Sequence, residues 1–175
     1  MRLTVNGKRY TQPLTLRLDP RVKTPATALA RLKSLSQEMY DGAVTAHAAH
    51  TRARALVAAL DKLSGADVEA FKARVESLAP APAQGARPRF RRGAVPPATT
   101  LDAASDAMLA AAMAMQGADM APTAMQVAAC DRARKEAGGL MAKWKTLETR
   151  GLAALNARRK AAGEAAVSIT EGGER

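Results

Sequence analysis

The sequence predicts a mainly α-helical protein, a long-helix antiparallel bundle of about four helices with an N-terminal β-hairpin. Alanine, the strongest helix former, supplies 42 of the 175 residues. Leu, Ile, Val and Phe together supply only 29 residues, and aromatics make up 3 %, which is too little for a densely packed α/β enzyme core or a many-stranded β domain. Strand-like alternation is confined to residues 1–19, and helical spacing of apolar residues follows.

The N-terminal segment is predicted to form the hairpin. Residues 3–5 and 14–18 are β-favouring, and leucine alternates with polar residues in the second run. Asn6-Gly7 suits a type I′ turn, which needs positive φ at both central positions, and Pro13 marks a bulge or an edge. Because two strands cannot bury a core alone, the hairpin either packs on the helices or belongs to a sheet whose other strands are missing.

A first helix of 40 residues is expected from Thr24 to Leu63. Thr24 is the predicted N-cap, and Pro25 takes the first helical position, where its missing N–H costs nothing. The middle of the helix carries small residues, and Gly42 is its expected weak point. Its heptad seam reads Leu29, Leu32, Ser36, Met39, Ala43, Ala46, His50, Ala53, Val57 and Leu60.

A second helix is expected over residues 66–78, with Ser64 and Asp67 at the spacing of a capping box. The short connection between the first two helices predicts an antiparallel helical hairpin. The apolar stripe of the second helix consists of Val68, Phe71, Val75 and Leu78.

A third helix is expected to start at Thr99-Thr100, with Asp102 at capping-box spacing, and to end near Gln116. It begins the second helical hairpin, which the turn over residues 117–122 closes. Its predicted apolar face consists of Leu101, Ala104, Met108, Leu109, Ala112 and Met115.

The fourth helix is expected to start at Thr123, with Gln126 three residues later, and to reach about Ala162. Gly138-Gly139 interrupts it and predicts a kink. Its seam consists of Val127, Cys130, Ala133, Ala137, Leu140, Met141, Trp144, Leu147, Leu152 and Leu155. The two long helices are expected to pair as an antiparallel coil, with the two short helices flanking one side.

The segment between the helical hairpins is expected to be a linker. It contains five of the nine prolines and four arginines but no acidic residue. The chain therefore divides into five parts: a hairpin at 1–23, helices at 24–79, a Pro/Arg-rich linker at 80–98, helices at 99–163, and a disordered tail at 164–175.

The linker contains the sharpest candidate for nucleic-acid binding. Arg87, Arg89, Arg91 and Arg92 offer guanidinium groups to phosphates, and Phe90 offers a ring for base stacking. A solvated basic loop is the favoured interpretation, because one aromatic residue is a poor stacking platform and no RNA-binding or helix-turn-helix motif accompanies it. The net charge of +11 favours an acidic partner or reflects an Arg- and Ala-rich proteome.

Few residues have the arrangement that catalysis or metal binding requires. His47 and His50 share a helix face, but no Cys or carboxylate stands at the matching turn, so a seam or surface pair is expected instead of a metal site. Cys130 is expected to be buried and inert, and a single cysteine allows no internal disulfide. Trp144 is interpreted as a core residue, with an interaction anchor as the alternative. We expect no enzyme activity and no cofactor.

The chain is also expected to carry neither a membrane span nor an export signal. No run of 18 apolar residues occurs, and the first ten residues lack the apolar segment of a signal peptide. As written, the chain is expected to remain in the cytoplasm.

The chain resembles the C-terminal region of large bacterial sortilin-like or BNR-repeat β-propeller proteins, which are often labelled glycosyl hydrolases or sialidase-like. The resemblance is most specific over residues 5–24, at Val5-Asn6-Gly7-Lys8, Tyr10-Thr11-Gln12-Pro13-Leu14 and Leu18-Asp19-Pro20-Arg21-Val22-Lys23-Thr24. It continues in the tail at Gln116-Gly117-Ala118-Asp119, Ala121-Pro122-Thr123, Trp144 and Ala154-Leu155-Asn156. Relatives of this kind are expected to be exported.

The resemblance implies that the hairpin at 1–23 is a remnant of a β-sandwich module and that the chain is a fragment or the product of a split gene. The leading hypothesis is a non-catalytic interaction or scaffolding appendage whose partner is a protein, either its own upstream propeller domain or a second copy. A small basic nucleic-acid-binding protein is the first alternative. The second is part of a glycosyl hydrolase whose catalytic propeller is absent, since the chain contains no Asp-box repeat.

Overall fold

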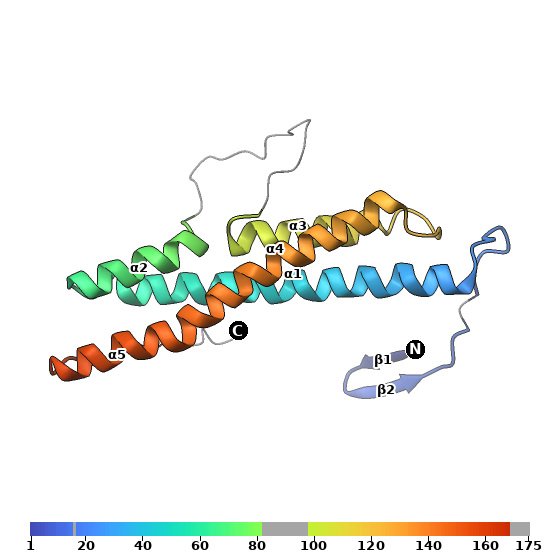
Figure 1. Ribbon diagram of the computed structural model, residues 1–175. Helices are drawn as coiled ribbons and strands as arrows, with labels where there is room; N and C mark the ends of the chain where they lie inside the picture. Colours follow the sequence, from blue (N-terminus) through green and yellow to red (C-terminus); the bar gives the residue numbers. More distant parts are fainter. Residues whose placement is uncertain (16, 82–97, 169–175) are drawn as a thin grey trace.

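The computed structural model describes residues 1–15, 17–81 and 98–168, and they form the predicted mainly α-helical bundle with an N-terminal two-stranded hairpin (Figure 1). The fourth predicted helix is observed as three consecutive segments, of which the middle one is a π-helical turn. The elements are β1 (Arg2–Val5), β2 (Lys8–Thr11), α1 (Ala26–Leu60), α2 (Ala66–Leu78), α3 (Leu101–Ala114), α4 (Ala124–Thr146), the π turn η1 (Leu147–Gly151) and α5 (Leu152–Ala161).

The turn of the hairpin is the one that the sequence predicts, but the second strand is not. Asn6 and Gly7 have φ values of 48° and 77°, as a type I′ turn requires. A two-residue turn places Lys8 opposite Val5, so β2 ends at Thr11, the partner of Arg2. The predicted strand at 14–18 is therefore wrong for Leu14, Thr15, Arg17 and Leu18, which have no strand left to pair with, and residue 16 lies outside the described residues.

Helix α1 is shorter at both ends than expected, and its predicted cap is wrong. Pro25 is the N-cap, and no side chain caps the helix. The Thr24 hydroxyl instead donates a hydrogen bond to the carbonyl of Asp119, 2.6 Å away. This contact ties the start of α1 to the turn between α3 and α4.

Helix α2 has the predicted bounds, and all four residues of its predicted stripe are buried. The predicted capping box is wrong, because the N-cap is Gly65, at a φ of 131° that an L-residue rarely adopts. The helix runs antiparallel to α1, as expected: Lys72 pairs with Asp61 at 2.6 Å, and Arg54 donates a hydrogen bond to the carbonyl of Ala79.

Helix α3 is capped by Thr100, whose hydroxyl accepts a hydrogen bond from the Ala103 N–H at 3.2 Å, and not by a capping box with Asp102. Its predicted apolar face is buried except for Leu109, which is 41 % exposed. The buried Ser105 hydroxyl donates a hydrogen bond to the carbonyl of Ala43 on α1, so the two helices lie close enough for a short side chain to reach the facing backbone.

Gly42 is the reason for this close approach and not a weak point of α1. A Cβ at Gly42 would lie 2.1 Å from the terminal methyl carbon of Met108 on α3. The glycine therefore leaves the space that the methionine fills, which is a known use of glycine at helix contacts.

The capping box predicted for the fourth helix is confirmed: Thr123 and Gln126 bond to each other's backbone N–H groups. The helix continues through Gly138 and Gly139, so the interruption predicted there is wrong. The hydrogen-bonding irregularity lies at η1, where Gly151 packs against the Phe71 ring of α2. Glycine weakens a helix without ending it when neighbouring turns hold it on both sides.

The two long helices run parallel to each other, so their predicted antiparallel pairing is wrong. Glu38 of α1 pairs with Arg134 of α4, and Arg52 pairs with Glu148, so that residue numbers rise together along both helices. Helices α2 and α3 both run antiparallel to α1 and lie one after the other along it (Figure 1). Helices α2 and α3 therefore run in the same direction. The turn after α3 reverses the chain, so α4 runs in the direction of α1.

The segment after α5 begins as an ordered strap, contrary to the disordered tail expected over 164–175. The Asn156 side chain bonds to both backbone polar groups of Val167, at 2.8 and 2.9 Å. Arg159 bonds to the carbonyl of Ala165 and pairs with Glu164. Residues 169–175 lie outside the described residues.

A thin core runs the length of the bundle, as the composition implies. Alanines line much of it, and the largest fully buried side chains are Met39, Leu56, Leu60, Leu101, Met115, Val57, Val75 and Cys130. Among the described residues, no helix combines the length and the hydropathy that crossing a bilayer would take.

Candidate functional site

The residues that the sequence singled out do not converge on one site. Arg87, Arg89, Phe90, Arg91 and Arg92 lie outside the described residues.

Trp144 lies on α4 and is only 3 % exposed, because its side chain packs in the core of the bundle. It therefore offers almost no surface to a partner as an interaction anchor.

His47 is exposed and His50 is half-buried on α1, and they do not form a metal site. Within the described part of the chain, no three His, Cys, Asp or Glu side chains cluster as metal ligands. Burial raises the pKa of the Asp106 carboxyl on α3, nearby Asp102 adds to the rise, and His47 opposes it more weakly. The pair therefore has a surface and seam placement, as expected.

Cys130 is buried in the seam, and burial raises the pKa of its thiol above the ordinary value. Arg134 opposes this shift, but more weakly. A raised pKa removes the thiolate that nucleophilic chemistry requires.

The hairpin presents an apolar face that no described residue covers. Every residue of β1 and β2 is exposed. The register places Leu3, Val5 and Tyr10 on one face, where they are 56 %, 47 % and 51 % exposed. Lys8 shares this face and lies 5.6 Å from the centroid of the Tyr10 ring. Apolar and polar residues therefore alternate along the hairpin as in a sheet that buries one face, but no described residue covers the apolar face.

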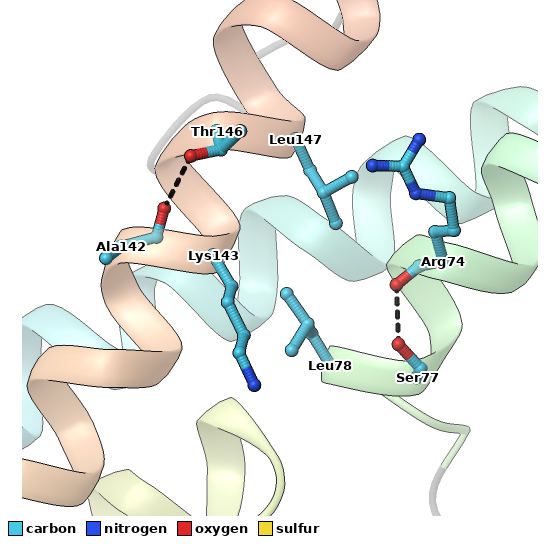
Figure 2. Close-up of a pocket in the computed structure, with 7 residues that line it drawn as sticks. All are labelled: Arg74, Ser77, Leu78, Ala142, Lys143, Thr146 and Leu147. Carbon is cyan, nitrogen blue, oxygen red and sulfur yellow. Dashed lines mark hydrogen bonds between the residues drawn. The ribbon is translucent and has the colours of Figure 1, made fainter.

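The bundle contains a hollow of about 430 Å³ between the C-terminal part of α2 and the end of α4 (Figure 2). Leu78 and Leu147 point toward one another and form its floor, while Arg74 of α2 and Lys143 of α4 stand on opposite sides. Its lining comprises Arg74, Ser77, Leu78, Ala142, Lys143, Thr146 and Leu147. The Ser77 and Thr146 hydroxyls donate to carbonyls of their own helices, at 2.7 and 2.9 Å, which leaves only their acceptor lone pairs for a ligand.

A second hollow, of about 730 Å³, also lies on α4, and Lys143 lines both hollows. We name the two together the α4 groove. The second hollow is lined by Ala98, Thr99, Asp131, Arg132, Lys135, Glu136, Gly139, Leu140 and Lys143. Open space surrounds Gly139, because an added Cβ would meet no atom within 4 Å.

The α4 groove is electropositive. Its cations are Arg74, Arg132, Lys135 and Lys143, and none of them forms an ion pair within the described residues. Both of its carboxylates are already engaged, Asp131 with Arg134 and Glu136 with the backbone N–H of Ala98. What the groove offers a ligand is therefore positive charge above an apolar floor.

Sequence reasoning missed this groove, although one signal for it was present. Arg132, Lys135, Gly139 and Lys143 follow one another at intervals of three and four residues, which is the spacing of a single helix face. The sequence could not predict that Arg74 lines the groove, because Arg74 lies on another helix and its position depends on how α2 packs.

Comparison with known proteins identified no relative: no family model, no curated protein and no solved structure matches the chain.

Proposed function

We propose that this chain is a non-catalytic interaction module that docks onto a partner protein through its hairpin, with the helical bundle as the support. One observation carries the proposal: the alternating hairpin exposes an apolar face of Leu3, Val5 and Tyr10, and no residue of either strand is part of the core that the helices form. Burying one such side chain contributes about 1.5 to 3 kcal/mol. An isolated two-stranded hairpin is marginally stable at best in water, so a partner that covers this face would stabilise it.

The partner that we propose is a β-sheet protein, namely the β-sandwich module of a sortilin-like propeller protein. The resemblance over residues 5–24 supports this choice, as do the two strands themselves, because an exposed strand edge pairs readily with another strand. Under this proposal, any glycosyl hydrolase activity belongs to the propeller and none to this chain. Self-association through the same face is the competing outcome.

The test compares two double variants of the full chain. Leu3→Ser with Tyr10→Ser removes two of the three side chains of the apolar face, while Thr4→Ser with Thr11→Ser changes the opposite face, where side chains point away from it. The probe is the purified β-sandwich module of a sortilin-like propeller protein from the same source, titrated by calorimetry. We expect the first variant to lose binding by at least tenfold and the control to keep it.

Three results would overturn the proposal. The unaltered chain fails to bind the module, both variants lose binding equally, or sedimentation shows that the apolar face only joins two copies of this chain. Circular dichroism of each variant verifies that the bundle stays folded, which is expected because no strand residue is part of the core.

A second candidate function is nucleic-acid binding by Arg87, Arg89, Arg91 and Arg92. One observation favours it: the segment that carries these arginines rejoins the described chain at Ala98, which lines the electropositive α4 groove. Binding should weaken steeply with salt, and replacing all four arginines with serine should flatten that dependence. Absence of binding at low salt would end this alternative.

A further inference from the structure

We propose that the α4 groove, independently of the hairpin, binds the phosphate backbone of a single-stranded nucleic acid. The proposal stands on described residues alone. Arg132, Lys135 and Lys143 project from one face of α4, and Arg74 projects from α2 across the hollow. Basic side chains along a groove can neutralise successive phosphates, which is the common feature of sites that bind single strands.

The charges of the groove are available to a ligand. Cations that are already paired would have to break those pairs on binding, but the four named above form none among the described residues. Asp131 and Glu136 also line the second hollow, where Arg134 pairs with Asp131 and the Ala98 N–H bonds to Glu136, so the groove holds four cations against two carboxylates. The local balance therefore favours an anion.

The dimensions suit a short stretch of one strand. From Arg132 to Lys143 the helix advances by about 16 Å at 1.5 Å per residue, which leaves room for a few successive phosphates of one strand. The groove is a hollow between helices, so a flexible strand can enter it, while a duplex presents a convex cylinder. Leu78, Leu140 and Leu147 line the hollows but are each only 6 % exposed, and no aromatic ring lines either hollow, so phosphate contacts dominate and we expect no sequence preference.

The salt dependence follows from the number of contacts. Four neutralised phosphates on a single strand give a slope of log K against log salt concentration of about −3. Affinity should then fall about 50-fold between 50 and 200 mM salt. Replacing three of the four cations should bring the slope close to −1, since each contact accounts for about −0.7.

The experiment titrates the full chain with fluorescein-labelled 12-nucleotide oligothymidylate, a duplex of the same length and inorganic polyphosphate. The groove variant is Arg132→Ser, Lys135→Ser and Lys143→Ser. The matched control, Arg31→Ser, Lys33→Ser and Arg150→Ser, removes the same charge from exposed positions outside the groove. We expect oligothymidylate to bind best, and the groove variant to weaken its binding at 50 mM salt at least tenfold more than the control does.

A second variant tests the shape of the groove without altering its charge. Gly139→Leu fills open space and introduces a better helix former, so the fold should be retained. We expect it to weaken oligothymidylate binding at least fivefold.

Several outcomes would overturn the proposal. They are no oligothymidylate binding at 50 mM salt, equal losses in the groove and control variants, tighter binding of the duplex or of polyphosphate, or no effect of Gly139→Leu. Loss of binding only when Arg87, Arg89, Arg91 and Arg92 are replaced would assign the activity to the arginine tract instead. A failure here leaves the hairpin proposal untouched, because the hairpin contributes no residue to the groove.

Discussion

At the residue scale, the glycines within the helices differ in how closely other side chains pack against them. Gly42 lies under the side chain of Met108, and Gly151 lies against the ring of Phe71, so both allow helices to approach closely. Gly139 faces open space and allows nothing of the kind. Their sequence contexts are all helical, and only the packing separates them.

Substituting alanine at these glycines should therefore move stability in opposite directions. Gly139→Ala should raise the free energy of unfolding by about 0.5 to 1 kcal/mol, because alanine is the better helix former. Gly42→Ala gains the same helix propensity, but its Cβ would lie 2.1 Å from the end of Met108, a side chain that must shift although it is only 5 % exposed, so the net effect should be a loss of up to about 2 kcal/mol. Urea unfolding followed by the fluorescence of Trp144 measures both, and shifts of the same sign would contradict the packing described here.

At the element scale, the helices hold their register through contacts between α1 and α4. Arg134 stands between Glu38 of α1 and Asp131 of its own helix, and hydrogen bonding to both carboxylates raises the pKa of the guanidinium further. The same contact, with the Arg134 guanidinium as its main cause, lowers the pKa of Glu38 below the ordinary value of 4.5. The pair fixes which turn of α4 faces which turn of α1.

This pair predicts a defined pH dependence. Because folding lowers the pKa of Glu38, its contribution to stability is complete above the unfolded-state pKa and is lost as pH falls through the folded-state value. Both side chains are more than 40 % exposed, so solvent screening limits the contribution to about 0.5 kcal/mol. Glu38→Gln should therefore destabilise the protein slightly at pH 7 and less at pH 3.

Chemical unfolding at both pH values measures this difference. Asp119→Asn is the control, because Asp119 is exposed, lies outside the helices, and its side chain forms no ion pair or hydrogen bond within the described part of the chain. A destabilisation by Glu38→Gln that persists unchanged at pH 3 would contradict the assignment.

Also at this scale, local chemistry predicted some helix ends and failed at others. The capping box of Thr123 and Gln126 was predictable because both partners lie within four residues. Thr24 has the same capping ability, but its hydroxyl bonds to Asp119, a residue 95 positions away. Sequence spacing contains no information about a distant carbonyl that competes with the helix for the Thr24 hydroxyl.

At the scale of the whole molecule, the class of fold was predictable and the direction of the helices was not. Alanine content and periodicity determined that there would be long helices with a thin seam. The parallel course of α1 and α4 depends on the connection between α2 and α3, which is long enough to permit either direction. Only the α4 side of the α4 groove was predictable, because its other walls come from α2 in the first hollow and from Ala98 and Thr99 in the second.

The central claim about the whole molecule is that the bundle is stable without a partner, whereas the hairpin is only marginally stable without one. Hydrogen exchange of backbone amides in the isolated chain tests this claim most directly. We predict rapid exchange at the amides paired between β1 and β2, whose residues are all exposed, beside strong protection around Met39, Ala46 and Leu56 in α1. Equal protection of the hairpin and α1 would mean that the hairpin is stable without a partner, and would contradict the account.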